Sequence, residues 1–354
     1  LGDVVFTYEA TLHRYAIIPD GFRGCLGRRV ALIRPDPSLT DSRYLLYFFL
    51  SHGWRKVVEG NIISGATVDR IPLERFPSFP AAIPSLPVQR EIASILSTYD
   101  DLIENNRRRM ALLEDSARLL YREWFVRLRF PGHEHTRIID GVPEGWKIKT
   151  IGQILDFHIG GGWGRDESQG IETEEGYVIR GTDIPEVERG NFEAVGLRFH
   201  DPKKLPQRLL RTGDIIFEVS GGSATQAIGR TLLVTEELLR VFSPRVICAS
   251  FCKVFRVSNP LMPYLLNRFI RHIRESGELA VYQKQSASAL QNFQFQAFLD
   301  GQRIVLPPPR LLRNFCEMQQ LLVRQQNNFA IQNQKLRAAR DFLLPRLMSS
   351  EIAV

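Results

Sequence analysis

The chain has 354 residues, 44 % of them hydrophobic, and because one ordinary core does not hold so many residues we expect two or more domains. Charged residues make up 24 % of the chain, as in an ordinary folded protein, and the formal net charge of +7 suits a polyanionic partner such as DNA. No apolar run is long enough to span a bilayer and no signal peptide is evident, so we expect a cytoplasmic protein with no membrane partner.

A long-period duplication begins at the first residues of the chain. Three segments recur in the same order: Gly2–Phe6 as Gly213–Phe217, Tyr44–Leu46 as Tyr264–Leu266, and Leu86–Pro87 as Leu306–Pro307. The spacing is 211 residues for the first pair and 220 for the other two, and three matches in order are hard to obtain by chance. The second copy begins near Gly145, so we expect the first copy, which starts at Leu1 and not at Met, to lack roughly its first 66 residues.

Each copy has the same plan, in which a region of short strand-like apolar runs precedes a long amphipathic helix without Gly. This pattern predicts an α+β (mixed) fold with an internal twofold repeat. We expect two globular domains separated by two long helices.

The two helices are predicted from about Val88 to Val126 and from about Leu311 to Leu347, each on the order of 55–60 Å long at ~1.5 Å per residue. Apolar residues recur at alternating steps of three and four, which predicts a coiled-coil seam. The seam includes Leu102, Asn106, Leu113, Leu120, Leu322, Phe329, Leu336 and Leu343.

Each helix could instead lie against its own domain, but a narrow stripe over so many turns favours a helix partner. We therefore predict that the two helices pair as an antiparallel coiled coil within the chain. Asn106 places a polar group in the seam, where a buried amide can fix the register, although a partly exposed position is an equally good interpretation.

Motifs that would indicate chemistry are absent. The sequence has no phosphate loop, no dinucleotide fingerprint around Gly160–Gly164, no GxSxG, no HExxH and no Asp-Pro-Pro-Tyr segment. Asp183 and Asp214 are interpreted as strand-end or turn residues. The four cysteines are scattered without metal-ligand spacing, so we expect reduced, buried thiols, no metal, no cofactor and no catalytic residue.

The helical segments resemble conserved regions of a known family. The first contains Leu86–Leu96, Asp100–Asn106, Leu112–Glu114 and Trp124–Val126, which look like the central conserved region of type I restriction-modification specificity subunits. Gly145-Trp146 followed by Tyr177–Ile184 looks like the opening of a target-recognition domain, and Leu336 with Ala339–Leu347 and Glu351-Ile352 looks like the distal conserved region. Ser349-Ser350-Glu351 departs from the family, which often has a Gly before the acidic residue.

The resemblance implies a sequence-specific DNA-binding subunit that is itself not an enzyme. It would read a bipartite double-stranded DNA target, dock methyltransferase (modification) subunits, and reach the restriction or motor subunits indirectly through the complex. The domains would be a truncated target-recognition domain 1 at 1–87, a central spacer helix at 88–130, target-recognition domain 2 at 131–306 and a distal spacer helix at 307–354.

Polar loop residues are the candidates for reading base edges, since specificity comes from the grooves while Lys and Arg on phosphate supply affinity. In the first domain these are His13, Arg14, Arg28, Arg29, Ser64 and Thr67. In the second they are Arg180, Thr182, Ser220, Ser223, Lys284, Gln285 and Ser286. Two other functions stay open: a coiled-coil scaffold that binds only proteins, and a DNA enzyme with an unrecognised active site.

Overall fold

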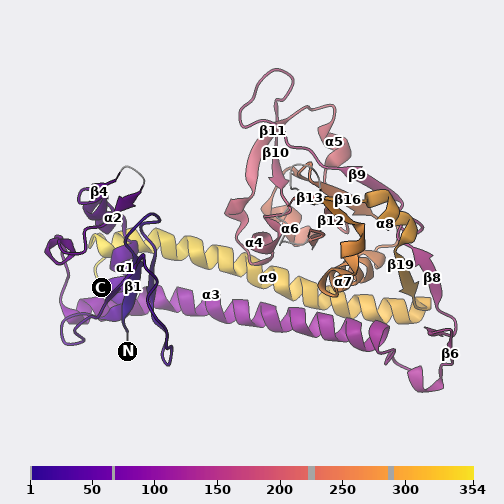
Figure 1. The fold of residues 1–354 in the computed structure, drawn as a ribbon, viewed down its shortest axis with the longest axis horizontal. Helices are drawn as coiled ribbons and strands as arrows, with labels where there is room; N and C mark the ends of the chain where they lie inside the picture. Colours follow the sequence, from indigo (N-terminus) through magenta and orange to yellow (C-terminus); the bar gives the residue numbers. More distant parts are fainter. Residues whose placement is uncertain (1, 66–67, 222–227, 286–290) are drawn as a thin grey trace. The chain divides into compact units, whose positions relative to one another are not determined.

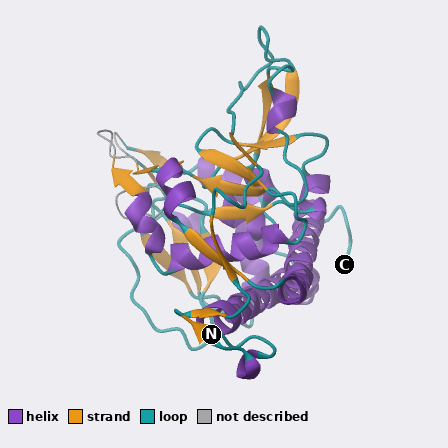
Figure 2. Cartoon of the chain, turned by 90° about the vertical axis from the view of Figure 1, so that its right-hand side faces the viewer, coloured by secondary structure: helices purple, strands orange, loops and turns teal. Residues whose placement is uncertain are grey.

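The structure is a computed structural model that describes residues 2–65, 68–221, 228–285 and 291–354 (Figure 1). Backbone contacts divide the chain into two compact units. The first unit contains residues 1–105 and 335–354, and the second contains residues 106–334. Figure 2 shows strands and helices intermixed, as expected of the predicted α+β class.

The first unit is built on a three-stranded antiparallel sheet. Strand β1 (Val4–Thr7) lies between β2 (Tyr15–Ile17) and β3 (Val30–Ile33). Val4 and Phe6 alternate inward and pack against Phe49 and Trp54, which come from two consecutive helices. The remaining elements are α1 (Ser42–Leu50), α2 (His52–Glu59), the hairpin of β4 (Ile63–Ser64) and β5 (Asp69–Arg70), and the 3-10 turn η1 (Phe76–Ser78).

The helices of the first unit start where the sequence provides caps. The Asp41 carboxylate accepts the Tyr44 N–H at 2.9 Å, and the Ser51 hydroxyl accepts the Trp54 N–H at 3.2 Å. Both side chains satisfy a backbone donor that the first helical turn leaves unpaired. This is why α2 begins one residue after Ser51, directly behind α1.

The second unit has a central sheet of four antiparallel strands in the order β14-β12-β16-β9. The bounds are β9 (Phe157–Gly160), β12 (Ile215–Glu218), β14 (Thr231–Leu233) and β16 (Cys252–Arg256). Helix α7 (Met262–Glu275) contributes Leu265, Leu266 and Ile270 to the core around this sheet. The sheet is therefore buried by the helix that follows it in sequence.

Smaller elements surround this sheet. The sheets are β11 (Gly196–His200)-β10 (Glu174–Ile179)-β15 (Val246–Cys248), β13 (Ser220–Gly221)-β18 (Gln291–Phe293)-β17 (Gln283–Gln285), β19 (Arg303–Leu306)-β8 (Lys147–Thr150) and β6 (Ile138–Ile139)-β7 (Val142–Pro143). The short helices and turns are η3 (His133–His135), α4 (Ile184–Glu188), η4 (Phe192–Ala194), α5 (Leu205–Arg208), α6 (Glu236–Val241), η5 (Glu278–Tyr282) and α8 (Phe295–Gly301).

The internal repeat predicted from the sequence is confirmed by the topology. The first unit has the strand order β2-β1-β3, and the second has β14-β12-β16 with β9 added beyond β16. In both units the strand that follows the Gly-Asp pair is central and antiparallel to both neighbours. Each unit is then closed by helical segments and a hairpin, β4–β5 or β17–β18, before a long helix begins.

The two long helices are present as predicted. Helix α3 (Leu86–Tyr121) continues as the π-helical turn η2 (Arg122–Val126), and α9 extends over Pro309–Met348. Within the second unit the two helices are antiparallel, because the residue numbers of the contacting partners decrease along α9 as they increase along α3. The contacts are Asn106 to Asn333, Met110 to Gln326 and Ala117 to Gln319. Within the first unit, Arg340 pairs with Asp100 and Leu343 and Leu347 pack in one cluster with Ile92 and Leu96.

The predicted seam needs one correction. Leu102 is 46 % exposed, and its neighbour Ile103 is buried in its place. A strict alternation of three and four residues assumes 3.5 residues per turn, whereas a straight helix has 3.6, so a predicted stripe drifts around the helix. Of the other predicted seam residues, Asn106 is buried, and the following are partly buried: Leu113, Leu120, Leu322, Phe329, Leu336 and Leu343.

The seam of the second unit contains a buried amide pair. The Asn106 Nδ2 group donates to Asn333 Oδ1 at 3.0 Å, and both side chains are buried. A buried polar group without a partner is unfavourable, so this pair favours one register over others that would bury the two amides among apolar side chains. The interpretation of Asn106 as a buried register residue therefore agrees with the structure.

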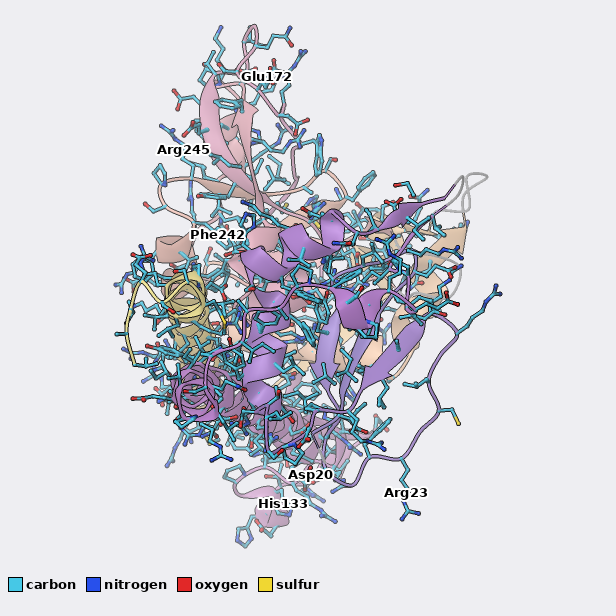
Figure 3. All side chains as sticks on the ribbon, turned by 90° about the vertical axis from the view of Figure 1, so that its left-hand side faces the viewer. Asp20, Arg23, His133, Glu172, Phe242 and Arg245 are labelled. Carbon is cyan, nitrogen blue, oxygen red and sulfur yellow. The ribbon has the colours of Figure 1, made fainter. Side chains whose placement is uncertain are left out.

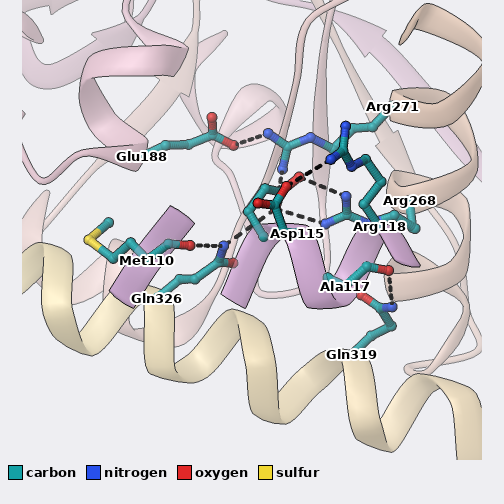
Figure 4. A network of polar contacts seen from close by, with 10 residues as sticks. Met110, Asp115, Ala117, Arg118, Glu188, Arg268, Arg271, Gln319 and Gln326 are labelled. Carbon is teal, nitrogen blue, oxygen red and sulfur yellow. Dashed lines mark hydrogen bonds and ion pairs between the residues drawn. The ribbon is translucent and has the colours of Figure 1, made fainter. Parts of the chain in front are cut away.

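A charged network joins the long helices to the rest of the second unit (Figure 4). Arg268 on α7 donates two hydrogen bonds to the Glu114 carboxylate on α3, at 2.7 and 2.9 Å. Arg271, also on α7, donates to Glu188 on α4 at 2.8 Å and lies 3.7 Å from Glu114. Gln326 on α9 donates to Glu114 and to the Met110 carbonyl. One carboxylate thus connects three helices.

The electrostatics of the network follow from its geometry. Burial opposes ionisation of Glu114, but the hydrogen bonds from Arg268 and the positive charge of Arg271 outweigh it and lower the pKa of Glu114 to about 2. Burial raises the pKa of Glu188, and Arg271 offsets part of that effect. Since the side chain of Arg268 is only 4 % exposed, Glu114 must remain ionised to compensate its buried charge.

Replacing Glu114 by Gln should therefore lower the free energy of unfolding of the second unit by roughly 3 kcal/mol, because it leaves a buried guanidinium without its counter-charge. The measurement is urea unfolding followed by the fluorescence of Trp124, Trp146 and Trp163. The matched control is Asp115→Asn, because Asp115 pairs with Arg118 and both side chains are exposed. Its effect should stay below about 0.5 kcal/mol, and equal effects of the two changes would contradict the assignment.

The same pair predicts a pH dependence. The folded-state pKa of Glu114, about 2, lies below the ordinary value of 4.5. A lowered carboxyl pKa contributes stability that is fully present above the ordinary value and is lost as the pH falls through the folded value. The difference in unfolding free energy between the wild type and Glu114→Gln should thus be constant above about pH 5 and shrink between pH 4.5 and pH 2. If the difference in unfolding free energy grew as the pH fell, the pKa of Glu114 would be raised in the folded state and not lowered.

Candidate nucleic-acid interface

Three strands of the second unit bring polar candidates side by side. Ser220 in β13 is directly opposite Asn292 in β18, and Asn292 is directly opposite Lys284 in β17. The Ser220 hydroxyl donates to Asn292 Oδ1 at 3.0 Å. Residues directly opposite in antiparallel strands have Cβ atoms ~5 Å apart on the same face. The sheet therefore presents a hydroxyl, an amide and an ammonium group in one row.

Asn292 was not among the candidates predicted from the sequence. Its neighbours Gln291 and Phe293 form a short polar-apolar segment with no motif of its own, and only the pairing of β13 with β18 brings it beside Ser220. Gln285 belongs to β17 and its backbone pairs with Gln291. Three other candidates, Thr67, Ser223 and Ser286, lie outside the described residues.

The candidates at the end of β10 have a structural role that the sequence did not reveal. Arg180 donates from Nε and Nη2 to the carboxylate of Asp183, which is 2 % exposed, and from Nη2 to the Ala194 carbonyl. Asp183 also accepts the backbone N–H of Arg180 at 2.9 Å. The pair closes the turn after β10, so Arg180 acts first as a turn-forming residue. Thr182 is exposed beside it.

The two acidic residues interpreted as turn or strand-end residues have those roles. Asp183 closes the turn with Arg180, as above. Asp214 accepts the Arg211 N–H at 2.7 Å and pairs with Arg256 through two hydrogen bonds of 2.7 Å. Because Asp214 is fully buried and its oxygens are bonded, it is part of the fold at the start of β12.

In the first unit the candidates separate into exposed and partly buried residues. Arg28 and Arg29 are exposed on the turn before β3, Arg14 is exposed before β2, and Ser64 is exposed in β4. His13 is partly buried in a left-handed conformation, and its Nδ1 atom is buried without a hydrogen-bond partner in the structure. Burial, followed by the nearby charge of Arg55, lowers the pKa of His13, which favours the neutral form of this ring.

The segment between β2 and β3 is exposed over residues 19–29. Phe22 is 61 % exposed and Leu26 is 51 % exposed. Figure 3 shows Arg23 extending outward from this segment. Cys25 lies here and is exposed, which corrects the expectation that all four thiols are buried; the other three are buried. The recurring Gly21, Gly24 and Gly27 are the sequence signal that this segment is neither helix nor strand.

Among the described residues, no group of three or more His, Cys, Asp or Glu side chains could hold a metal ion. In the same part of the chain, no helix is both long and apolar enough to cross a membrane.

The row of Ser220, Asn292 and Lys284 offers hydrogen-bond donors and acceptors and a positive charge. This is the chemistry of a surface that binds the base edges and phosphates of a nucleic acid.

The fold is that of a repeated α+β protein, and comparisons with known proteins show which proteins this chain is similar to. Residues 2–115 match the family described as type I restriction modification DNA specificity domain. The chain is 26 % identical over 323 residues to the type I restriction enzyme MjaIX specificity subunit of Methanocaldococcus jannaschii, covering 88 % of this chain and 69 % of that protein. It is 25 % identical over 294 residues to the StySPI specificity subunit of Salmonella potsdam, covering 81 % and 59 % respectively.

The fold agrees with these relatives. The crystal structure of a type I restriction-modification S subunit from M. genitalium matches with a TM-score of 0.58 at 15 % identity, covering 98 % of this chain and 82 % of that one. The resemblance seen in the sequence is thus confirmed: the chain is related to the specificity subunits of type I restriction-modification enzymes, a family with DNA sequence specificity.

The row across β13, β18 and β17 makes a prediction about DNA affinity. Lys284→Ala in the full chain should weaken DNA binding and reduce the slope of log K against log salt by about 1, since one phosphate contact releases about one counterion. Binding is measured by fluorescence anisotropy at several salt concentrations. Lys149→Ala, an exposed lysine of β8 outside the row, is the matched control and should leave the slope unchanged. The row would be excluded as a phosphate contact if both variants gave the wild-type slope.

Proposed function

We propose that the chain is the DNA-recognition subunit of a type I restriction-modification complex and that it reads a bipartite double-stranded DNA target. The observation that supports this most is the repeated sheet, β2-β1-β3 and β14-β12-β16, each accompanied by a hairpin that carries exposed polar residues such as Ser64 and Lys284. Two copies of one recognition fold in one chain could each bind one half of a target that consists of two different half-sites. Dimeric DNA-binding proteins bind two half-sites in the same way, with one DNA-binding module on each.

The proposed division of labour follows the segments predicted from the sequence. Residues 1–87 and 131–306 would each read one half-site, and the segments 88–130 and 307–354, which contain α3 and α9, would carry the methyltransferase subunits. The restriction or motor subunits would be reached through that complex. The chain itself would not catalyse, and it would act in the cytoplasm, where the host DNA is.

Exposed apolar side chains on the long helices support the docking of methyltransferase subunits. On α3, Leu112 and Leu119 are 67 % and 50 % exposed, and Val126 at the end of η2 is 51 % exposed. The spacing of seven residues keeps Leu112 and Leu119 on nearly one face of α3. On α9, Leu321 is 64 % exposed and Met318 is 38 % exposed. A row of large apolar residues on a solvent-facing helix is typical of a surface that another protein covers.

Methylation mapping tests the function as a whole. The full chain is expressed with its methyltransferase subunits in cells lacking other methylation, and methylated bases are mapped over the genome. The expected result is a motif of two specific parts separated by a gap of fixed length. A single contiguous motif would contradict bipartite reading, and no sequence-specific methylation at all would contradict the assignment as a specificity subunit.

The two alternatives give different results. A scaffold that binds only proteins would show no salt-dependent DNA binding. A DNA enzyme would show methylation, cleavage or ATP hydrolysis by the purified chain alone, whereas we expect none. Turnover that persists through successive purification steps and is lost on mutation of this chain would favour the enzyme.

If the methyltransferase subunits dock on the exposed apolar residues of α3, a substitution there should prevent complex formation without preventing DNA binding. Leu112→Asp with Leu119→Asp should abolish co-purification with the methyltransferase subunits and abolish methylation, because it places two charges in an apolar contact. DNA binding by the full chain should remain. Ile171→Asp, at a similarly exposed apolar residue of the loop before β10, is the matched control and should retain both activities. Normal complex formation by the double variant would exclude this face as the docking surface.

A further inference from the structure

The two units share a hydrogen-bond pattern that their sequences do not suggest. In the first unit, the Tyr8 N–H donates to the Arg29 carbonyl at 3.1 Å. In the second, the Val219 N–H donates to the Phe251 carbonyl at 2.9 Å. Tyr8 follows β1 and Val219 follows β12, and Arg29 and Phe251 directly precede β3 and β16. Arg29 and Phe251 therefore occupy the same position of the repeat.

The pattern continues on the other side of the same segment. The Tyr8 carbonyl accepts the Ile71 N–H at 2.8 Å, and the Val219 carbonyl accepts the Phe293 N–H at 2.9 Å. Two residues after each carbonyl, the backbone takes a positive φ, 67° at Ala10 and 130° at Gly221. Beyond lie the hairpins β4–β5 and β17–β18.

We call this four-segment arrangement the reading edge. In the first unit it consists of the turn 28–29, residues 8–10, β5 and β4; in the second, of the turn 250–251, residues 219–221, β18 and β17. The strand pairings inside each unit show which residue of the first unit corresponds to which residue of the second. There are four such corresponding positions: Arg29 and Phe251, Glu9 and Ser220, Arg70 and Asn292, Ile63 and Lys284. The backbone pattern is the same in both units, and the side chain differs at each of these positions.

The backbone of Phe251 is hydrogen-bonded while the residue itself is exposed. Its carbonyl accepts N–H groups from both Val219 and Ser220, and the flanking Ala249 and Cys252 are buried. Phe251 itself is 56 % exposed. A single exposed apolar residue is ordinary by itself. Here, however, its backbone is fixed directly beside the row of Ser220, Asn292 and Lys284, and the equivalent position carries Arg29, whose side chain is also 56 % exposed.

From this placement we infer that position 29 or 251 of the reading edge is a specificity-determining position, and that Phe251 contacts the 5-methyl group of a thymine. The inference rests on the proposed function. A phenylalanine side chain has no hydrogen-bond donor or acceptor to offer in the major groove, so its discriminating contact is with the thymine methyl group. Arg29 in the same position would donate to guanine O6 and N7, the favoured partner of a guanidinium.

Deoxyuridine substitution tests the contact. The full chain in complex with its methyltransferase subunits is bound to its mapped target, in which each thymine is replaced in turn by deoxyuridine, which lacks only the methyl group. The wild type should lose about fourfold in affinity at one thymine, the fold-change equivalent to ~0.8 kcal/mol for one buried methyl group. With Phe251→Ala, affinity at that position should be equal for thymine and deoxyuridine. Discrimination at the other thymines should be unchanged.

A matched control and a second variant keep the result interpretable. Ile171→Ala removes a comparably exposed apolar side chain of the second unit outside the reading edge and should keep the wild-type pattern. Phe251→Arg should shift the preferred base pair at the same position towards guanine, while the other half-site is unchanged. Wild-type urea unfolding of both Phe251 variants would show that the backbone of the edge is intact.

The outcomes separate the two levels of the hypothesis. If the wild type methylates a bipartite target but shows no loss with deoxyuridine, or if Phe251→Ala keeps that loss, the role of Phe251 is wrong and the proposed function stands. If the wild type shows no sequence-specific methylation, the proposed function is wrong and this inference falls with it. Loss of discrimination in Ile171→Ala would also contradict the assignment of the contact to the reading edge.

Discussion

The antiparallel pairing of α3 with α9 is the constraint on which the rest of the structure depends. An apolar seam tolerates slippage by one heptad, because such a shift still buries apolar side chains. The second unit reduces this freedom with polar contacts: Asn106 to Asn333, and Gln319 to the Ala117 carbonyl. A slipped register would leave these buried groups without partners, at about 1–3 kcal/mol for each. The polar interruptions that weaken the seam as a hydrophobic contact therefore define which residues meet.

The same helices also anchor the central sheet within the second unit. Glu114 lies on α3 beside the seam, yet its main partners are two arginines of α7, the helix that covers the central sheet. Gln326 of α9 donates to the same carboxylate, so the helix pairing and the attachment of α7 share one residue. Because buried ion pairs depend strongly on geometry, this arrangement allows little rotation of α7 against α3. The position of the sheet is thus tied to the register of the helices.

Much of the fold could be predicted from the sequence, because apolar periodicity and repeated motifs are local signals. The spans of α3 and α9 were predicted within two residues at most ends, and the internal repeat was recognised from three short matches. The errors arose where a side chain depends on distant residues. Leu102 was placed in the seam although the neighbouring Ile103 is buried. Arg180 stays a candidate DNA contact, but its hydrogen bonds to buried Asp183 were not foreseen. Asn292 and Phe251 carried no signal, because strand pairing alone brings them beside Ser220.

The repeat separates what maintains the reading edge from what could give it specificity. The edge is held by backbone hydrogen bonds, Tyr8 to Arg29 in one unit and Val219 to Phe251 in the other. Such bonds do not depend on the outward side chains, so an arginine and a phenylalanine are accommodated by the same turn. Exposed positions of this kind can change with little effect on stability, usually within about 0.5 kcal/mol. A fold with this property can acquire a new base preference by substitution at the edge while its core and its helix register stay as they are.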